Sequence, residues 1–274
     1  MKKLFLIFTI FLLSSLMCAQ QQVKEPKKTS GFSFSTSALM SSGYIWRGLN
    51  CGGPSLQMDA TVDYKGLFLN MWWNVGVTDW TFSTFQPEVD FSIGYSRWGL
   101  SVYYIHMYLF DRYEDGTMSR FFDFRNRTVG GTTGEWRVSY HYPFESFGGD
   151  VCLLACVRTF GRDGYLNESG ELKRAYSSYI ELGYNQELGE NWELQTRVGV
   201  TPAKSIYTRY QGDFAVMLVG MKLQKTWSLG CGKMNAYAHL MLQPWQVNKD
   251  NLIMPIDKAG GQKLNLAVGV GWRL

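Results

Sequence analysis

The chain has 274 residues, of which 16% are aromatic and 18% are charged. Its formal net charge of +4 is too small to indicate a nucleic-acid partner, and no segment after the N-terminus has the 18 or so consecutive apolar residues of a membrane helix. A soluble domain rarely needs so many aromatic residues, whereas membrane-spanning β-barrels use them at both membrane interfaces.

The first 19 residues have the order of a secretory signal peptide. Lys2 and Lys3 form a basic start, and the apolar run 4–13 follows them. Met17-Cys18-Ala19 then provides a small-residue cleavage site. An uncleaved membrane anchor is the alternative. The polar stretch 20–30 is predicted to be a flexible leader, and residues 31–274 to form one domain.

Beyond the leader, twelve segments alternate between apolar and polar residues, which is the pattern of β-strands. Most are close to the 9–11 residues that a tilted membrane strand needs, and a closed antiparallel bacterial barrel requires an even number of strands. The segments are 32–47, 55–64, 67–76, 87–95, 99–108, 135–143, 150–160, 176–187, 191–201, 214–227, 233–243 and 263–274.

The connections between these segments are alternately long and short. The long ones are 49–54, 77–86, 109–134, 161–175, 202–213 and 244–262, and the short ones are 65–66, 96–98, 144–149, 188–190 and 228–232. This sorting is typical of outer-membrane barrels, which have short periplasmic turns and long extracellular loops. The sequence therefore predicts an all-β fold, a closed antiparallel transmembrane barrel of about 12 strands in the bacterial outer membrane.

The two faces of each segment agree with this fold. In 55–64, Leu56 and Met58 alternate with Gln57 and Asp59. In a membrane the apolar face contacts lipid and the polar face lines the lumen, and a soluble barrel would reverse this arrangement. Alternation alone fits both cases, and the signal peptide, the aromatic content and the loop sorting favour the membrane.

Two hairpins allow a register to be predicted. The tight turn Lys65-Gly66 sets Tyr64 opposite Leu67, which keeps both faces consistent. A three-residue turn at 188–190 would set Glu181 directly opposite Arg197 on the inner face. Opposite charges so placed form an ion pair worth about 0.2–1 kcal/mol. We expect this pair to narrow the lumen.

The stretch 42–74 reads SGYIWRGLNCGGPSLQMDATVDYKGLFLNMWWN, with Tyr44-Ile45-Trp46-Arg47-Gly48 followed by the Asp63–Leu67 hairpin. It resembles the opening of the Gcw_chp family, a group of bacterial proteins regarded as outer-membrane barrels, and the run 179–200 is also similar to that family. The resemblance implies the barrel fold and brings no assigned activity. The long loop 109–134 departs from the family pattern.

The Tyr44–Gly48 motif lies at the outer end of the first segment. By parity Tyr44 and Trp46 would face lipid as part of an aromatic girdle, and Arg47 would face inward. We interpret Arg47 as a partner in an ion pair, with contact to a ligand as the alternative.

Charged residues on the polar face are the main candidates for function, because buried charges must be paired or hydrated. The predicted lumen set consists of Arg47, Asp59, Asp63, Glu88, Asp90, Arg137, Arg158, Glu181, Glu193, Arg197, Lys222 and Arg273. No catalytic, cofactor-binding or metal-binding residues are predicted. The histidines on this face, His141 and His239, show no partner motif, although Ser139 is two residues from His141.

The four cysteines left after cleavage are expected to be mostly unpaired, although an exported chain can form disulfides. Cys152 and Cys156 lie on one predicted strand, about 13 Å apart, and cannot bond to each other.

Three functions fit these observations. The first is a passive, porin-like channel for small solutes, favoured because inner-face glycines such as Gly183 and Gly199 would leave room in the lumen. The others are a non-conducting structural or surface-interaction barrel and a lipid-modifying enzyme of the outer membrane. The expected partners are outer-membrane lipid and small solutes, with no nucleic acid and no cofactor, and the sequence leaves the oligomeric state open.

Overall fold

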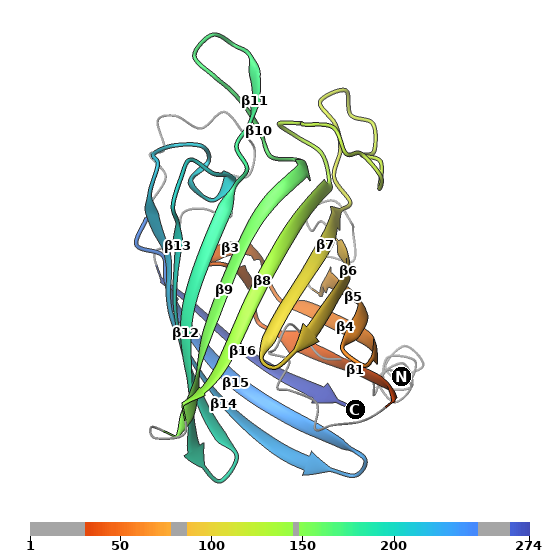
Figure 1. Cartoon of the computed structure of the whole chain (residues 1–274), viewed down its shortest axis with the longest axis vertical. Helices are drawn as coiled ribbons and strands as arrows, with labels where there is room; N and C mark the ends of the chain where they lie inside the picture. Colours follow the sequence, from red (N-terminus) through yellow and green to blue (C-terminus); the bar gives the residue numbers. More distant parts are fainter. Residues whose placement is uncertain (1–30, 78–86, 145–147, 246–263) are drawn as a thin grey trace.

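The computed structural model describes residues 31–77, 87–144, 148–245 and 264–274, so the predicted signal peptide and leader lie outside it. Twelve of its strands form a closed antiparallel barrel in the order β1-β16-β15-β14-β13-β12-β9-β8-β7-β6-β5-β4 (Figure 1). The first and last strands pair with each other, with Ser37 opposite Arg273. Closure satisfies the backbone groups that an open sheet edge would leave unpaired, as a membrane requires.

The strands of the wall follow the alternating segments of the sequence. They are β1 (Phe32–Ser41), β4 (Ser55–Tyr64), β5 (Leu67–Gly76), β6 (Glu88–Arg97), β7 (Leu100–Leu109), β8 (Thr132–Phe144), β9 (Gly149–Gly161), β12 (Ser178–Gly189), β13 (Trp192–Thr201), β14 (Ala215–Leu229), β15 (Gly232–Leu242) and β16 (Leu264–Arg273). Within the described residues, the connections contain two small hairpins and a 3₁₀ turn. These are β2 (Tyr44–Trp46) with β3 (Leu49–Gly52), β10 (Gly164–Leu166) with β11 (Leu172–Arg174), and η2 (Ile206–Thr208).

The strand bounds confirm the predicted sorting of connections, and residues 78–86, 145–147 and 246–262 of three of them lie outside the described residues. Short turns join the strands at the lower end in Figure 1, the short-turn end, and the β10–β11 hairpin stands at the opposite, long-loop end. Lys65-Gly66, Trp98-Gly99 and Glu190-Asn191 each have two residues with positive φ, the geometry of a type I′ hairpin turn. The register predicted for the first of these hairpins is also confirmed, with Tyr64 opposite Leu67. None of the described helices is long and apolar enough to cross a membrane.

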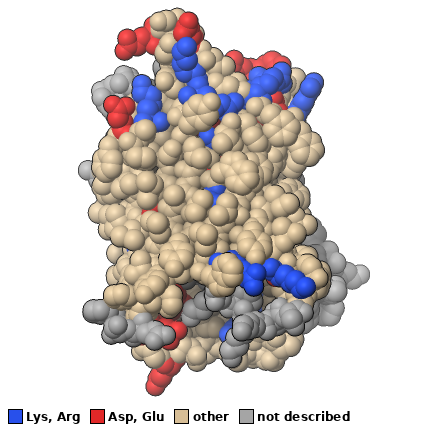
Figure 2. Space-filling view, viewed as in Figure 1, with Lys and Arg blue, Asp and Glu red and all other residues tan. Residues whose placement is uncertain are grey.

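The outer surface of the barrel is apolar. On β16, for example, Leu266 is 66% exposed, while Ala267 beside it faces the interior and is buried. On the face seen in Figure 2, uncharged residues cover most of the middle of the barrel, and charged side chains gather towards the two ends. A contiguous apolar surface of this extent suits lipid rather than water, so the fold is that of a membrane-spanning barrel.

The inner-face glycines do not leave empty space, and this part of the sequence interpretation is wrong. A Cβ atom at Gly183 would lie 2.6 Å from the Arg197 side chain, and one at Gly199 would lie 1.9 Å from the Tyr179 hydroxyl. Large side chains on the neighbouring strand occupy the space that a side chain at either glycine would need. The glycines therefore allow arginine and tyrosine side chains to lie flat against the wall.

The long connection 110–131 packs against the outside of the barrel. His106 and Tyr108 of β7 point outward, and their ring nitrogen and hydroxyl contact the Phe121 and Ser119 carbonyls at 2.9 and 2.7 Å. Inside this connection Asp123 accepts hydrogen bonds from Arg125 at 2.7 Å, Arg127 at 2.6 Å and the Tyr113 hydroxyl at 2.7 Å.

These contacts predict how the order of the 110–131 loop depends on pH. The Arg125 hydrogen bond, followed by those of Tyr113 and Arg127, holds the pKa of Asp123 well below its usual range. A carboxylate with a lowered folded-state pKa stabilises the loop at all pH values above about 4 and stops doing so in stronger acid. Hydrogen exchange of the loop, corrected for intrinsic rates, should therefore stay constant between pH 5 and 8.

Asp123→Asn should speed exchange throughout 110–131 at neutral pH. Asp115→Asn is the matched control, because the described hydrogen bonds of Asp115 are local and come from Thr117. Equal effects of the two substitutions on the whole loop would show that Asp123 does not organise it.

Candidate functional site

The first long connection turns into the barrel. The sequence predicts one strand over 32–47, but β1 ends at Ser41 and the β2–β3 hairpin leaves the wall. Its tip is Arg47-Gly48, with φ of 51° and 82°. A Cβ atom at Gly48 would lie 2.2 Å from the Met217 carbonyl oxygen of β14, so the close approach of tip and wall requires glycine. We call residues 43–53 the inward hairpin.

Arg47 fixes the tip of the inward hairpin to β8. Its Nη2 donates to Glu135 Oε1 at 2.6 Å and its Nη1 donates to Oε2 at 2.8 Å. Glu135 is fully buried and also accepts from Arg137 Nε at 2.6 Å. A two-pronged arginine–carboxylate contact is both strong and geometrically specific, so it holds the hairpin in one orientation.

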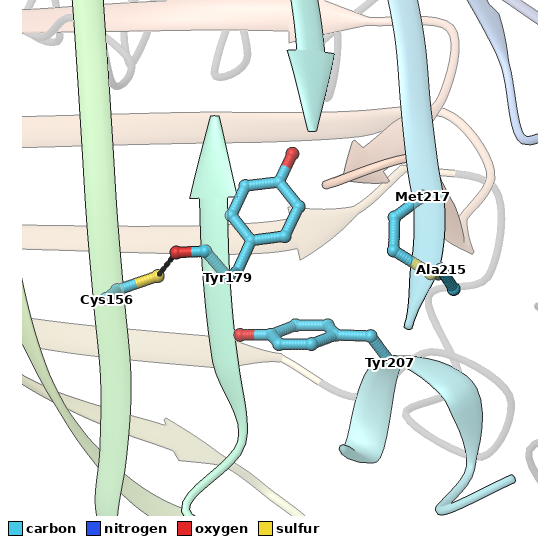
Figure 3. Packing of buried hydrophobic residues seen from close by; sticks show 5 residues of the cluster. All are labelled: Cys156, Tyr179, Tyr207, Ala215 and Met217. Atoms are coloured by element: carbon cyan, nitrogen blue, oxygen red, sulfur yellow. Dashed lines mark hydrogen bonds between the residues drawn. The ribbon is translucent and has the colours of Figure 1, made fainter. Parts of the chain in front are cut away.

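Aromatic rings surround this ion pair. The Arg47 guanidinium carbon lies 4.6 Å from the centre of the Trp46 ring, 4.7 Å from that of Tyr179 and 5.4 Å from that of Tyr207. Figure 3 shows Tyr207, carried by η2, pointing toward Tyr179 on β12. The Tyr207 hydroxyl also donates to Glu135 Oε2 at 3.2 Å. Two long connections therefore meet inside the barrel, and this cluster narrows the lumen.

The sequence predicts that Tyr44 and Trp46 face lipid, but in the structure both side chains lie inside the barrel. Trp46 packs against Tyr207, with ring centres 5.4 Å apart. The Tyr44 hydroxyl donates to Glu88 Oε2 of β6 at 2.8 Å. The prediction of an aromatic girdle at Tyr44 and Trp46 is wrong because the chain leaves the wall after Ser41, whereas the inward direction of Arg47 is confirmed.

Among the described residues, six charged groups lie where the inward hairpin narrows the lumen, which we call the narrow part. Three arginines, Arg47, Arg137 and Arg158, surround Glu135, and Arg158 Nε lies 3.9 Å from that carboxylate. Two further carboxyl groups, Glu88 and Asp90, lie buried on β6. Arg137 shares β8 with Glu135 and Arg158 comes from β9, so the excess of arginine lies on β8 and β9, whereas β6 carries only carboxyl groups at this level.

A second tier of charge lies nearer the short-turn end. Asp59 of β4 accepts from Asn70 Nδ2 at 2.5 Å, and Asp63 lies four residues further along the same face of the strand. Lys222 of β14 lies 4.5 Å from the centre of the Tyr237 ring. Arg197 and Arg273 add to this basic side, from β13 and β16. Glu193 of β13 accepts from Gln195 Nε2 at 2.9 Å.

The predicted register of the β12–β13 hairpin is wrong by two residues. Glu181 lies opposite Gly199, and Arg197 lies opposite Gly183. The connection is the two-residue turn Glu190-Asn191 with a bulge at Leu188, not the three-residue turn 188–190. A shift of two keeps every side chain on its predicted face.

The Glu181–Arg197 pair nevertheless exists as a diagonal contact. Arg197 Nε lies 3.5 Å from Glu181 Oε1, and the Tyr179 hydroxyl donates to Glu181 Oε2 at 2.8 Å. Diagonal neighbours are within reach of a long side chain such as arginine.

A charge-swap experiment tests this contact. Glu181→Arg should lower the stability of the barrel, and adding Arg197→Glu should recover part of the loss, with a coupling energy of about 0.2–1 kcal/mol. Stability is measured by urea unfolding in lipid vesicles. Glu187→Arg, at the exposed end of the same strand, is the control and should show no coupling to Arg197→Glu. Strictly additive effects at 181 and 197 would contradict the pair.

A cavity of about 620 Å³ occupies the lumen, and all twelve wall strands contribute to its lining. The inward hairpin lines it as well, through Tyr44, Trp46 and Arg47. Of the predicted lumen set, the cavity is lined by Arg47, Asp59, Asp63, Arg137, Glu181, Arg197, Lys222 and Arg273. The other four members of the predicted set do not line the cavity. Three are buried beside the narrow part, namely Glu88, Asp90 and Arg158, and the fourth, Glu193, lies on the inner face of β13.

Glu135, the centre of the ion-pair cluster, is missing from the predicted set. The signal for it is present in the sequence, because Glu135 has the same strand parity as Arg137 and so must face inward. Of the predicted histidines, His141 and His239 line the cavity. The side-chain contact of the His141 ring is with Cys152 Sγ at 3.2 Å rather than with Ser139, so these residues do not form a serine–histidine pair.

No family model matches the chain, and no curated protein matches it. Among solved structures, the NanC porin is 8% identical with a TM-score of 0.49, and the match covers 88% of this chain and 98% of that one. An outer-membrane channel from Pseudomonas putida F1 is 9% identical with a TM-score of 0.48, covering 93% and 99% of the two chains. OmpF of Salmonella typhi is 9% identical with a TM-score of 0.38, covering 89% and 98%.

Proposed function

We propose that this protein is an outer-membrane channel that passes small polar solutes through a lumen narrowed by the inward hairpin. The apolar exterior, the sorting of short and long connections and the signal-like N-terminus support this location. A barrel of twelve strands is intermediate between small barrels filled with side chains and the wide channels of 16–18 strands.

The observation that carries the proposal is the lumen cavity. It is lined by all twelve strands and by the hairpin, and its wall carries charged residues from one tier to the next. A purely structural barrel of this size needs no charged lining. Apolar side chains would fill its interior at a lower desolvation free energy than buried charges.

The arrangement of charge indicates which solutes suit the channel. At the narrow part, three arginines surround Glu135 of β8, and Glu88 and Asp90 lie on β6, so arginines and carboxyl groups are equal in number and neither sign dominates. Separated groups of opposite charge produce a field across the lumen, which orients molecules that carry both charges. We therefore expect weak ion selectivity and a preference for small dipolar or zwitterionic solutes.

Swelling of proteoliposomes tests the function. Vesicles containing the refolded protein should swell rapidly in isosmotic glycine, more slowly in a monosaccharide and hardly at all in a trisaccharide. Protein-free vesicles and vesicles with heat-unfolded protein are the controls. Glycine uptake no faster than in the controls would reject a channel and favour a structural barrel.

A further inference from the structure

A cluster of possible metal ligands lies on the inner wall of the barrel, away from the narrow part. His141 of β8 and Cys152 of β9 are directly opposite each other, and Asp150 lies two residues from Cys152 on the same face. One ligand atom of each, an imidazole nitrogen, the cysteine Sγ and a carboxylate oxygen, lies within 4.8 Å of the others. In the described part of the chain this is the one cluster of three such groups.

The geometry of the cluster suits a small, borderline-soft ion. His141 Nδ1 and Cys152 Sγ are already 3.2 Å apart. Bonds of about 2.0–2.3 Å to zinc place neighbouring ligands of a tetrahedron about 3.3–3.8 Å from one another, so His141 and Cys152 need only small side-chain movements. Histidine with cysteine is a ligand pair that zinc accepts and that magnesium or calcium does not favour.

The surroundings of the cluster also fit a metal site. Asn185 of β12 donates from Nδ2 to Asp150 Oδ2 at 3.0 Å and to Cys152 Sγ at 3.2 Å. The carboxylate oxygen and the sulfur are therefore both oriented toward the Asn185 amide. Arg197 Nη2 in turn donates to Asn185 Oδ1 at 2.6 Å and fixes that amide. Such outer contacts orient metal ligands. The charge of Arg197 opposes a cation, but Glu181, 3.5 Å away, offsets it.

We propose that His141, Asp150 and Cys152 form a site for Zn²⁺ or a similar transition-metal ion on the wall of the lumen. Three protein ligands leave a fourth position for water or a solute. On binding, the Cys152 S–H proton leaves to water as the Zn–S bond forms, and the His141 Nδ1 lone pair coordinates while its other ring nitrogen keeps its proton. Because His141 and Cys152 line the cavity, the ion would enter from the lumen.

Metal titration of the folded barrel in detergent tests the site directly. Wild-type protein should bind one Zn²⁺, and Co²⁺ in its place should give the absorption of a cobalt–thiolate bond. Cys152→Ser should abolish that absorption, and His141→Ala should weaken Zn²⁺ affinity at least about tenfold. Mg²⁺ at the same concentration should not compete.

Matched variants on the same inner face control for nonspecific effects. Cys156→Ser and His239→Ala remove the same residue types elsewhere in the lumen and should leave the cobalt absorption unchanged. If the ligand variants do not fold, the wild-type chain still decides the question. Zn²⁺ should protect Cys152 from a small thiol reagent while the exposed Cys51 and Cys231 react as before.

Two results would overturn the site. One is a cobalt–thiolate absorption that survives Cys152→Ser, and the other is equal labelling of Cys152 with and without Zn²⁺. These measurements need no conductance, so they stand whether or not the barrel passes solutes.

Discussion

Replacing the inward hairpin, residues 43–53, with a short Gly-Ser linker should increase the permeability of the barrel several-fold. The hairpin crosses the lumen, and its tip touches Glu135 on β8 and Met217 on β14. Because the wall closes without β2 and β3, through β1–β4 pairing, the shortened chain should still fold. Liposome swelling should then become fast with the trisaccharide that the wild-type channel excludes.

The β10–β11 hairpin provides the control for this change. The hairpin stands beyond the long-loop end of the barrel (Figure 1), and removing its tip, residues 167–171, shortens a long connection without removing any residue that lines the lumen cavity. Solute uptake should stay at the wild-type rate. Equal uptake by the wild type and the 43–53 replacement would show that the inward hairpin does not restrict the lumen.

The second large effect is expected at Glu135. Glu135→Gln keeps the shape of the side chain but leaves Arg47 and Arg137 without the carboxylate that both contact at 2.6 Å. Removing one partner of a buried ion pair costs about 3–5 kcal/mol, because the remaining charge stays desolvated. Urea unfolding in lipid vesicles, followed by the change in gel mobility between folded and unfolded barrel, measures the loss.

Glu193→Gln is the matched substitution. Glu193 also lies on the inner wall, but its described hydrogen bond is to a neutral group, Gln195, so we expect a change below about 0.5 kcal/mol. Adding Arg47→Gln to Glu135→Gln should cost less than the sum of the two single changes, since the two residues act as one unit. A purely additive result would mean that the hairpin is held by other contacts.

Most of the wall could be predicted from the sequence because a membrane barrel repeats one local rule. Each strand has a period of two and one apolar face, so parity alone places Asp59, Arg137 and Lys222 inside. The Lys65-Gly66 turn also fixes its own register. The β12–β13 register escaped prediction because a bulge at Leu188 changes the spacing without changing the faces.

The site itself was harder to predict, for a different reason. Strand periodicity continues through Tyr44-Ile45-Trp46 whether the chain stays in the wall or turns inward. The informative signal is Arg47-Gly48, which has the same X-Gly turn chemistry as Lys65-Gly66 and positive φ at both residues. Contacts such as Arg47 with Glu135 join residues 88 positions apart, and only the closed barrel brings them together.

Single-barrel currents in a planar lipid bilayer test the central claim most directly. Folded wild-type protein, added to a bilayer in symmetric potassium chloride, should give discrete current steps, and a salt gradient should produce a reversal potential close to zero because the narrow part holds both signs of charge. Folded protein that inserts and gives no steps, even after replacement of residues 43–53, would contradict a conducting lumen.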